Sequence, residues 1–258
     1  IKKSNYHFYK LDLIKDEELD IVFKKIKPDL VMHLAAESHV DRSISSSRIF
    51  IESNIIGTYN LLESTRKYYE SLDSKKKLQF RFHHISTDEV YGSLGKSGTF
   101  HEKTPYNPRS PYSATKASSD HLVNAWFHTY GIPVIVSNCS NNFGPWQFPE
   151  KFIPVVILKA LKNQSIPIYG TGLNVRDWLF VEDHINALLR IESLGLVGES
   201  YCVGGESEIS NYDLVLRIFD IINEIKKEEK DYTSLIKFVS DRPGHDFRYA
   251  IDSSKLKK

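Results

Sequence analysis

Residues 110–131 read SPYSATKASSDHLVNAWFHTYG, with apolar runs on either side, FRFHHIS at residues 80–86 and VIVS at residues 134–137. Ser110 is a preferred N-cap residue, Pro111 suits the first position of a helix, and Gly131 suits the position after its last turn. The stretch therefore predicts a helix between two buried strands. A strand, a helix and a second strand in succession are typical of a βαβ unit in a parallel sheet.

The same alternation continues on both sides of this unit. Short runs rich in β-branched and aromatic residues alternate with longer helical stretches. Strands are predicted at residues 8–13, 30–34, 80–86, 134–137, 166–169, 178–181 and 200–203, and helices at residues 17–26, 47–69, 111–130, 152–162, from 183 and 211–225. The alternation predicts an α/β fold, a Rossmann-type doubly wound parallel sheet with a smaller C-terminal lobe.

The composition argues against several classes of protein. Hydrophobic residues make up 41% of the chain and charged residues 26%, which is typical of a globular protein. The 34 basic and 33 acidic residues form no basic block, so we expect no nucleic-acid partner. No apolar run approaches the roughly 18 residues of a membrane span, and we expect no membrane partner. Two distant cysteines, Cys139 and Cys202, imply neither a disulfide framework nor a metal site, and we expect a cytoplasmic protein.

Both ends of the sequence lead us to expect a chain truncated at each end. It begins with Ile1, and its only methionine, Met32, lies inside an apolar run. No glycine precedes Gly57, so we expect any glycine-rich cofactor loop to lie upstream of residue 1. Residues 92–98 (GSLGKSG) match a phosphate loop by letter, but three prolines and no helix follow. A phosphate loop must open a helix, so we reject this match.

Tyr112 and Lys116 are four residues apart near the start of the helix predicted over residues 111–130, which puts both side chains on one face. A phenol with a pKa of about 10 is a poor base near neutral pH, but a nearby ammonium and the helix N-terminus favour the phenolate. Such a tyrosine could take a proton from a sugar hydroxyl while hydride leaves the same carbon. The spacing is equally that of a simple helix-surface pair, so alone it does not establish a function.

Two carboxylates follow directly after the predicted strand at residues 80–86, in the segment STDEVYG at residues 86–92. Open α/β sheets bind ligands at the carboxyl ends of their strands. Two acids in different surroundings can divide into a general acid and a general base. The alternative is a polar turn that closes the strand.

The strand predicted at residues 30–34 ends in the segment LAAES at residues 34–38. Its small side chains would let a flat ligand approach the backbone, or they would simply pack against their neighbours.

These segments occur together in the order of one enzyme family. Residues 33–43 (HLAAESHVDRS) are followed by STDEVYG at 86–92 and YSATK at 112–116. The set resembles the extended short-chain dehydrogenase/reductases, and within them the dTDP-glucose 4,6-dehydratases. Later segments agree, namely NNFGP at 141–145, FPEKFIP at 148–154, PIYG at 167–170, RDW at 176–178, VEDH at 181–184 and DRPGHD at 241–246.

The resemblance implies a reaction and roles for five residues. NAD would stay bound, take a hydride from C4 of the glucose and return it to C6, giving a 4-keto-6-deoxy sugar. Tyr112 would deprotonate O4, with Lys116 holding its pKa down, and Thr87 would polarise the C4 oxygen. Glu89 would remove the C5 proton, and Asp88 would protonate the departing C6 hydroxyl.

The resemblance also implies binding residues and partners. Positions that match cofactor contacts are Asp12, Leu13, Leu34, Ala35, Ala36, Glu37, Ser38, Ser53, Tyr112 and Lys116. Positions that match contacts to a nucleotide-sugar are Ser38, Thr87, Asn141, Lys151, Tyr169, Arg176, Asn211, Arg242 and His245. Members of this family commonly form a homodimer through two long helices, here residues 47–69 and 111–130.

We place a domain boundary in the irregular segment that follows residue 141. Residues 1–145 would form an NAD-binding domain that lacks its first strand and glycine loop, and residues from about 176 to 203 would return to it. Residues 146–175 and 204–258 would form the nucleotide-sugar-binding lobe.

Other functions stay open at this point. A nucleotide-sugar 4-epimerase would share the fold, NAD and the Tyr112/Lys116 pair, but it would not need Asp88 and Glu89 after the strand. Another NAD-dependent nucleotide-sugar 4,6-dehydratase and a non-catalytic NAD-binding fragment are further alternatives.

Some of the residues also have structural interpretations. Arg176 precedes Asp177 and Arg242 follows Asp241, so each pair could form an exposed ion pair that contributes under about 1 kcal/mol. Three histidines with no partner pattern are interpreted as structural: His83, His84 and His184.

Overall fold

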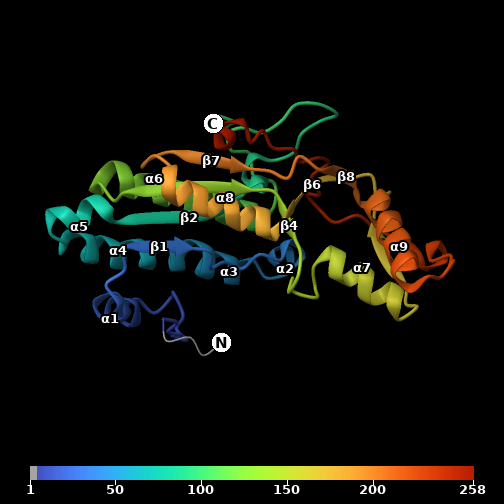
Figure 1. Ribbon diagram of the computed structural model, residues 1–258, viewed down its shortest axis with the longest axis horizontal. Helices are drawn as coiled ribbons and strands as arrows, with labels where there is room; N and C mark the ends of the chain where they lie inside the picture. Colours follow the sequence, from blue (N-terminus) through green and yellow to red (C-terminus); the bar gives the residue numbers. More distant parts are fainter. Residues whose placement is uncertain (1–4) are drawn as a thin grey trace.

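A four-stranded parallel sheet forms the centre of the protein, whose computed structural model describes residues 5–258. Its strands, in spatial order, are β1 (Leu30–His33), β2 (Arg81–Thr87), β3 (Val134–Cys139) and β7 (Ser200–Val203). Every neighbouring pair is parallel, so the four carboxyl ends lie at one edge of the sheet. Helices cover both faces (Figure 1), which confirms the predicted Rossmann-type α/β fold.

Three helices bury the two faces of this main sheet. They are α4 (Gly57–Glu70), α6 (Pro111–Tyr130) and α8 (Val181–Leu194). Val136 of β3 belongs to a buried cluster with apolar side chains of α4 and α6. Its neighbour Ile135 points to the opposite face and clusters with Ile191 of α8, the helix that crosses the front of the sheet in Figure 1. Coverage of both faces explains why the strands read as apolar runs.

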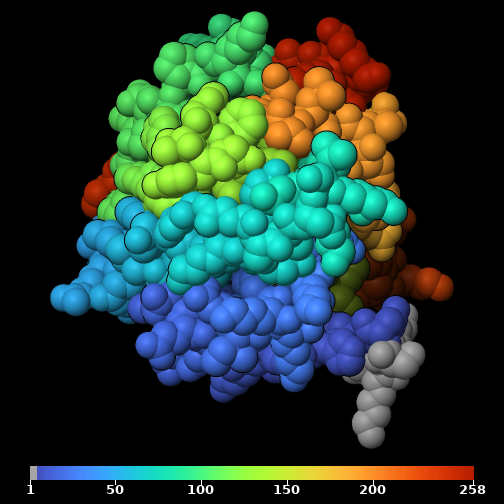
Figure 2. Space-filling view, turned by 90° about the vertical axis from the view of Figure 1, so that its left-hand side faces the viewer, coloured from blue at the N-terminus to red at the C-terminus, as the bar shows by residue number. Residues whose placement is uncertain are grey.

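Short elements connect the strands and helices of the main sheet. They are α1 (Asp16–Ile26), α2 (Val40–Ser45), α3 (Ser47–Phe50), the π-helix η1 (Ile51–Ile56), α5 (Ser74–Gln79) and the 3-10 turn η2 (Asp88–Tyr91). Figure 2 shows the end of the molecule where the main-sheet strands begin, and there α5 (teal) lies between α1 (blue) and the end of α6 (yellow-green). The long connection through α2, α3 and η1 leaves the carboxyl end of β1, beside the site described below.

A smaller lobe stands at the other end of the molecule (Figure 1). It consists of α7 (Phe152–Leu161), β5 (Ile166–Tyr169), α9 (Asn211–Lys226), the 3-10 turn η3 (Thr233–Leu235) and β9 (Ile236–Val239), with β5 and β9 paired in parallel. The lobe has its own apolar core, in which Val156, Ile168 and Phe219 are buried together. We call this unit the smaller lobe throughout.

A second sheet joins the main sheet to the smaller lobe. It contains β4 (Asn141–Phe143), β6 (Val175–Phe180) and β8 (Glu208–Ser210). After β9 the chain returns to the main sheet, where Tyr249 and Ile251 pack against Val90 and Cys202, and α10 (Ser254–Lys257) contacts β7. The last ten residues therefore lie with the main sheet, although the sequence assigned them to the nucleotide-sugar lobe.

Most predicted elements are present, with two clear differences. The helix predicted over residues 111–130 has those bounds, and the rejected phosphate loop is followed by irregular chain as far as Ser110. The helix predicted over residues 47–69 is interrupted by the π-helix η1. The strand predicted at residues 8–13 is wrong: the segment is irregular, because no strand within residues 5–258 pairs with it. Among the described residues, no helix has the length and apolar character needed to cross a membrane.

Candidate active site

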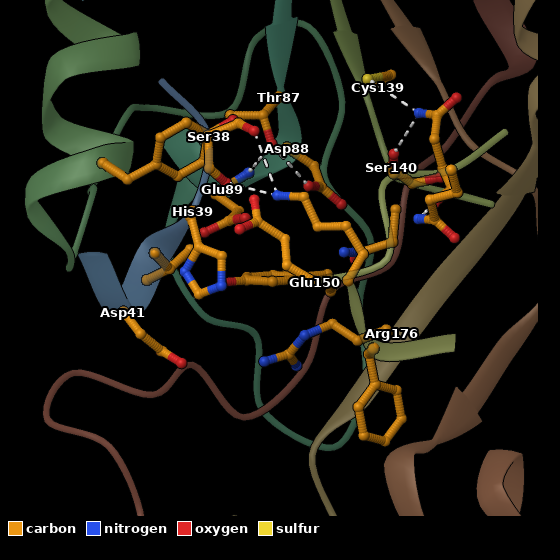
Figure 3. Close-up of a pocket in the computed structure, with 18 of the residues that line it drawn as sticks. Ser38, His39, Asp41, Thr87, Asp88, Glu89, Cys139, Ser140, Glu150 and Arg176 are labelled. Atoms are coloured by element: carbon orange, nitrogen blue, oxygen red, sulfur yellow. Dashed lines mark hydrogen bonds between the residues drawn. The ribbon is translucent and has the colours of Figure 1, made fainter. Parts of the chain in front are cut away.

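A cavity of about 620 Å³ lies between the carboxyl ends of the main-sheet strands and the smaller lobe (Figure 3). It is lined by these residues of the sequence-predicted site: Leu34, Ala36, Ser38, Thr87, Asp88, Glu89, Tyr112, Lys116, Asn141, Lys151, Tyr169, Arg176, Asn211, Arg242 and His245. A second cavity of about 550 Å³ is lined by the remaining ones: Asp12, Leu13, Ala35, Glu37 and Ser53, with Ala36 lining both. The structure thus brings all the predicted site residues to two adjoining cavities, and their individual roles stay predictions.

The polar residues at the end of β2, Thr87, Asp88 and Glu89, are held by a tight turn. Thr87 is the last residue of β2, and its hydroxyl accepts a hydrogen bond from the backbone N–H of Glu89 at 3.3 Å. This cap starts the turn η2 and directs Asp88 and Glu89 to the cavity. The turn ends at Gly92 with φ +86°, where a Cβ would lie 2.4 Å from the carbonyl oxygen of Asn107, so only glycine fits.

The two carboxylates have unequal surroundings. Asp88 is 1% exposed, and its Oδ2 is buried with no hydrogen-bond partner among residues 5–258. Burial raises the pKa of Asp88 well above its ordinary value, and the neighbouring Glu89 carboxylate raises it further. Burial also raises the pKa of Glu89, but the guanidinium groups of Arg242 and Arg176 oppose that rise. Asp88 is therefore suited to hold a proton, and Glu89 to accept one.

Tyr112 and Lys116 lie one turn apart at the start of α6, and both side chains are buried. Lys116 Nζ donates a hydrogen bond to the carbonyl oxygen of Ile85 at 2.9 Å. Burial raises the pKa of Tyr112 well above its ordinary value, the Glu89 carboxylate adds to the rise, and a hydrogen bond with Thr87 opposes it. The described residues alone therefore favour the neutral phenol, and the role of Lys116 in lowering the pKa of Tyr112 stays a prediction.

A buried polar group behind Lys116 was not found from the sequence. Asp120, one turn further along α6, is fully buried and accepts hydrogen bonds from Ser86, Tyr106 and Asn138. Burial lowers the pKa of Lys116, and the Asp120 carboxylate opposes that fall. Asp120 therefore helps to keep the buried lysine charged. Its position at i+4 from Lys116 was the available signal.

Two arginines take part in the cavity wall rather than in exposed ion pairs. Arg176 is 6% exposed, donates to the carbonyl oxygens of Val175 and Asp246, and lies over the Tyr249 ring at 4.3 Å from its centroid. Its sequence neighbour Asp177 instead accepts N–H bonds from the backbone of residues 205 and 207. The guanidinium of Arg242 pairs with Asp41 at 3.3 Å, whereas the Asp241 side chain bonds to the backbone N–H of Arg242. The structural interpretation of both arginines as exposed pairs is wrong.

The loop between the two cavities has the form that NAD requires. Leu34, Ala35 and Ala36 are exposed, so their backbone is open to a flat ring or a pyrophosphate. The side chain of Asn54, in the π-helix, holds the loop through both backbone groups of Glu37, at 2.8 and 3.0 Å. The carboxylate of Asp12 in the second cavity is an acceptor suited to ribose hydroxyls. The small loop, the carboxylate and Lys116 together fit a dinucleotide.

The histidines interpreted as structural line neither cavity. His83 contacts Glu192 at 2.5 Å and Ser137 at 2.9 Å, His84 lies 3.1 Å from Asp120, and His184 contacts Asn142 at 2.8 Å. These side chains join strands and helices inside the fold.

Several residues of the larger cavity were missed by the sequence reasoning. They are His39, Asp41, Cys139, Ser140, Asn142, Glu150, Trp178 and Tyr249, among others. Figure 3 shows Ser38, Thr87, Asp88 and Glu89 together at one side of the cavity, and Asp41 and Arg176 at the other. Asp41 belongs to the quoted segment at residues 33–43, but nothing in its local pattern marks it as a contact between distant segments.

Known proteins are similar to this chain in both sequence and fold. The chain matches the family described as GDP-mannose 4,6 dehydratase over residues 1–258. The dTDP-glucose 4,6-dehydratase of Neisseria meningitidis serogroup B is 54% identical over 258 residues, covering 98% of this chain and 73% of that protein. The dTDP-glucose 4,6-dehydratase 1 of Escherichia coli K12 is 55% identical over 262 residues, with the same two coverages.

A solved structure agrees with these matches. DesIV, a dTDP-glucose 4,6-dehydratase from Streptomyces venezuelae with NAD and TYD bound, has a TM-score of 0.89 and 37% identity, covering 99% of this chain and 73% of that one. The matches confirm the resemblance stated from the motifs: the chain belongs to the GDP-mannose 4,6-dehydratase family of the extended short-chain dehydrogenase/reductases.

Proposed function

We propose that this protein is a dTDP-glucose 4,6-dehydratase, which converts dTDP-glucose to dTDP-4-keto-6-deoxy-glucose and water with NAD as a bound cofactor. One observation carries the proposal: two carboxylates of unequal acidity, Asp88 and Glu89, line the same cavity as Tyr112 and Lys116. A reaction that only inverts C4 needs a base for one hydroxyl. A reaction that also removes water needs an acid and a second base as well.

The first step is the oxidation of C4. We assign Tyr112, as the phenolate, as the group that takes the O4 proton, and Thr87, which lines the same cavity, as the group that polarises O4. When bound, NAD would supply the acceptor for the C4 hydride and the donor for its return to C6. Lys116 is fixed by the Ile85 carbonyl, and its remaining N–H donors are available to the tyrosine and to a ribose hydroxyl.

The second step is the loss of water. A ketone at C4 makes the C5 proton acidic, and we assign Glu89 as the base that takes it. Asp88, whose pKa is raised by burial, gives its proton to the C6 hydroxyl, and this group leaves as water. Return of a proton from Glu89 to C5 then restores the Glu89 carboxylate. Tyr112 releases the O4 proton to the solvent, and Asp88 regains its proton from the solvent.

The remaining residues of the larger cavity suit a nucleotide-sugar. Arg176 and Arg242 supply the planar donors that bind phosphate oxygens. Tyr169 supplies a ring that can stack on a base, and the Oδ1 of Asn141 is a buried acceptor without a partner among residues 5–258. Relatives named dTDP-glucose 4,6-dehydratase, at 54% identity, support dTDP as the carrier.

We further propose a division of the chain between the two ligands. Residues 1–145 and about 176–203 would bind NAD, and residues 146–175 together with the part of 204–258 in the smaller lobe would bind the nucleotide-sugar. The separate apolar core of the smaller lobe supports this division.

We also propose a cytoplasmic homodimer. Ile56 at the end of η1, Tyr59 near the start of α4 and Tyr130 at the end of α6 are exposed. A second copy of the chain would bury this apolar surface. Both cysteines are free thiols, which fits a reducing compartment. Light scattering of the purified protein measures its mass in solution. A monomeric mass would contradict the proposed homodimer.

The test of the proposed activity is turnover of dTDP-glucose followed by mass spectrometry. We expect a product lighter by one water, no net consumption of NAD, and a higher kcat/KM for dTDP-glucose than for UDP-glucose or GDP-mannose. Inversion at C4 without loss of water would instead identify a 4-epimerase. Equal kcat/KM values for the three donors would contradict the assignment of dTDP-glucose.

A further inference from the structure

Asp41 connects the main sheet to the smaller lobe across the larger cavity. It lies in α2, soon after β1, and its side chain lines the cavity. Its Oδ2 accepts a hydrogen bond from the Tyr169 hydroxyl at 2.8 Å, and its Oδ1 accepts one from Arg242 Nη1 at 3.3 Å. These partners come 128 and 201 residues later in the chain. One carboxylate thus contacts two residues that the proposed function assigns to the substrate.

The Arg242 guanidinium is bonded to Asp41 through Nη1, and its other N–H donors can bind a ligand. A guanidinium carries five N–H donors, and Asp41 accepts from one of them. Arg242 Nε is buried and has no hydrogen-bond partner among the described residues. A buried donor without an acceptor is costly unless a ligand supplies the acceptor. Because Asp41 fixes Nη1, it sets the direction in which the other donors point.

Tyr169 and Arg242 also belong to one connected group on the smaller-lobe side. Asp241 accepts a hydrogen bond from the Arg242 backbone N–H at 2.9 Å, and its Oδ1 contacts His245 Nδ1 at 2.6 Å. The His245 ring lies edge-on to the Tyr169 ring, with centroids 6.2 Å apart. Movement of any one of these four residues therefore disturbs the others. Asp41 connects them to the main-sheet side through its hydrogen bonds to Tyr169 and Arg242.

We propose that Asp41 is a positioning residue for the nucleotide-sugar: it orients Tyr169 and Arg242 and holds the smaller lobe against the main sheet. The inference rests on the proposed function, because it assigns those two residues to the substrate. Asp41 acts through binding groups and, within residues 5–258, its side chain makes no hydrogen bond to Thr87, Asp88 or Tyr112, so its removal weakens binding more than it slows the chemical steps.

The test compares Asp41→Asn and Asp41→Ala with a matched control in the same helix. Arg42 follows Asp41 and also reaches across the cavity mouth, where it pairs with Glu150, but it does not line the cavity. We expect the Asp41 variants to raise KM for dTDP-glucose about tenfold, as the loss of a charged hydrogen bond predicts, with kcat within about twofold. Arg42→Gln should leave KM within about twofold, because exposed ion pairs contribute little.

A double-variant cycle and a binding measurement complete the test. Asp41→Ala combined with Tyr169→Phe should raise KM by less than the product of the single effects, because both changes remove the same hydrogen bond. An unchanged KM, a fall in kcat alone, or an equal effect of Arg42→Gln would overturn the inference. Calorimetric titration with dTDP separates the two proposals. Tight dTDP binding that Asp41→Ala does not weaken rejects the role of Asp41 alone, whereas a wild type that binds no dTDP rejects the nucleotide site and this inference with it.

Discussion

Asp88 and Glu89 are adjacent in sequence, but only Asp88 is almost fully buried. If Glu89 is the base for C5, Glu89→Gln should cut turnover on the order of 10²–10⁴-fold and stop exchange of the C5 proton with deuterated solvent. Asp88→Asn should permit that exchange and slow the loss of the C6 hydroxyl, because only the acid is missing. Proton NMR of the exchange and mass spectrometry of the product measure both. Near-normal turnover of Glu89→Gln would show that the pair is merely a turn that closes β2.

Tyr112 is assigned to the earlier step, so its loss should act before any elimination. We expect Tyr112→Phe to prevent the appearance of reduced cofactor in a single turnover and to lower kcat by about 10²-fold or more. Tyr6→Phe is the control, since Tyr6 is 56% exposed and lines neither cavity. Stopped-flow absorbance at the wavelength of the reduced nicotinamide distinguishes the two. Normal cofactor reduction in Tyr112→Phe would assign the base to another residue.

Residues of the site were predictable where a local pattern or a family motif marked them. Thr87 and Tyr112 stand at a strand end and at a helix start, where sequence signals are strong. Asp41 and Asp120 were missed because their partners are distant: Asp41 contacts Arg242, and Asp120 contacts Ser86 on β2. The raised pKa of Tyr112 was also missed, since the degree of burial is a property of the packed fold.

The helix α6 carries Tyr112 and Lys116, so its start sets the geometry of the site. Ser110 and Ser113 form a capping box, with Ser110 Oγ accepting from the Ser113 N–H at 3.1 Å. We expect Ser110→Ala to lower the free energy of unfolding by about 1 kcal/mol and to lower kcat, because the first turn loses its cap. Ser118→Ala, in the middle of the helix, should change the free energy of unfolding by less than about 0.5 kcal/mol. Urea denaturation of both variants measures this, and equal effects would contradict a role of the cap.

Helices and strands were predicted correctly where the local sequence carries capping residues or a clear pattern. Both ends of α6 carry capping residues, and its bounds were predicted correctly. The interruption at η1 carries no such signal, since a π-helix depends on packing, here with Asn54 turned to Glu37 and Thr115. The strand predicted at residues 8–13 illustrates the opposite error, because an apolar run becomes a strand only when a neighbouring strand pairs with it.

Buried histidines connect helices to strands in the whole fold: His184 of α8 contacts Asn142 of β4, and His84 of β2 lies beside Asp120 of α6. His184 of α8 is 7% exposed, its Nδ1 contacts Asn142 of β4, and its Nε2 has no partner among the described residues. Burial lowers the pKa of His184 to about 4, and burial likewise lowers the pKa of His84 to about 4. A proton on the Nε2 of His184 would be a buried charge without an acceptor, so the folded state excludes it.

These histidines predict that the protein loses stability in mild acid. In the unfolded chain a histidine binds a proton near pH 6.5, whereas folded His184 binds one only near pH 4. The unfolded state therefore holds more protons between these values, and stability present above pH 6.5 is lost as the pH falls toward 4. For His184 this loss is on the order of 3 kcal/mol. Urea denaturation at several pH values from 4.5 to 7.5 should show a shallower pH dependence for His184→Asn than for the wild type. The exposed His128 provides the control, and a slope in His184→Asn as steep as in His128→Asn would show that His184 is not held neutral by burial.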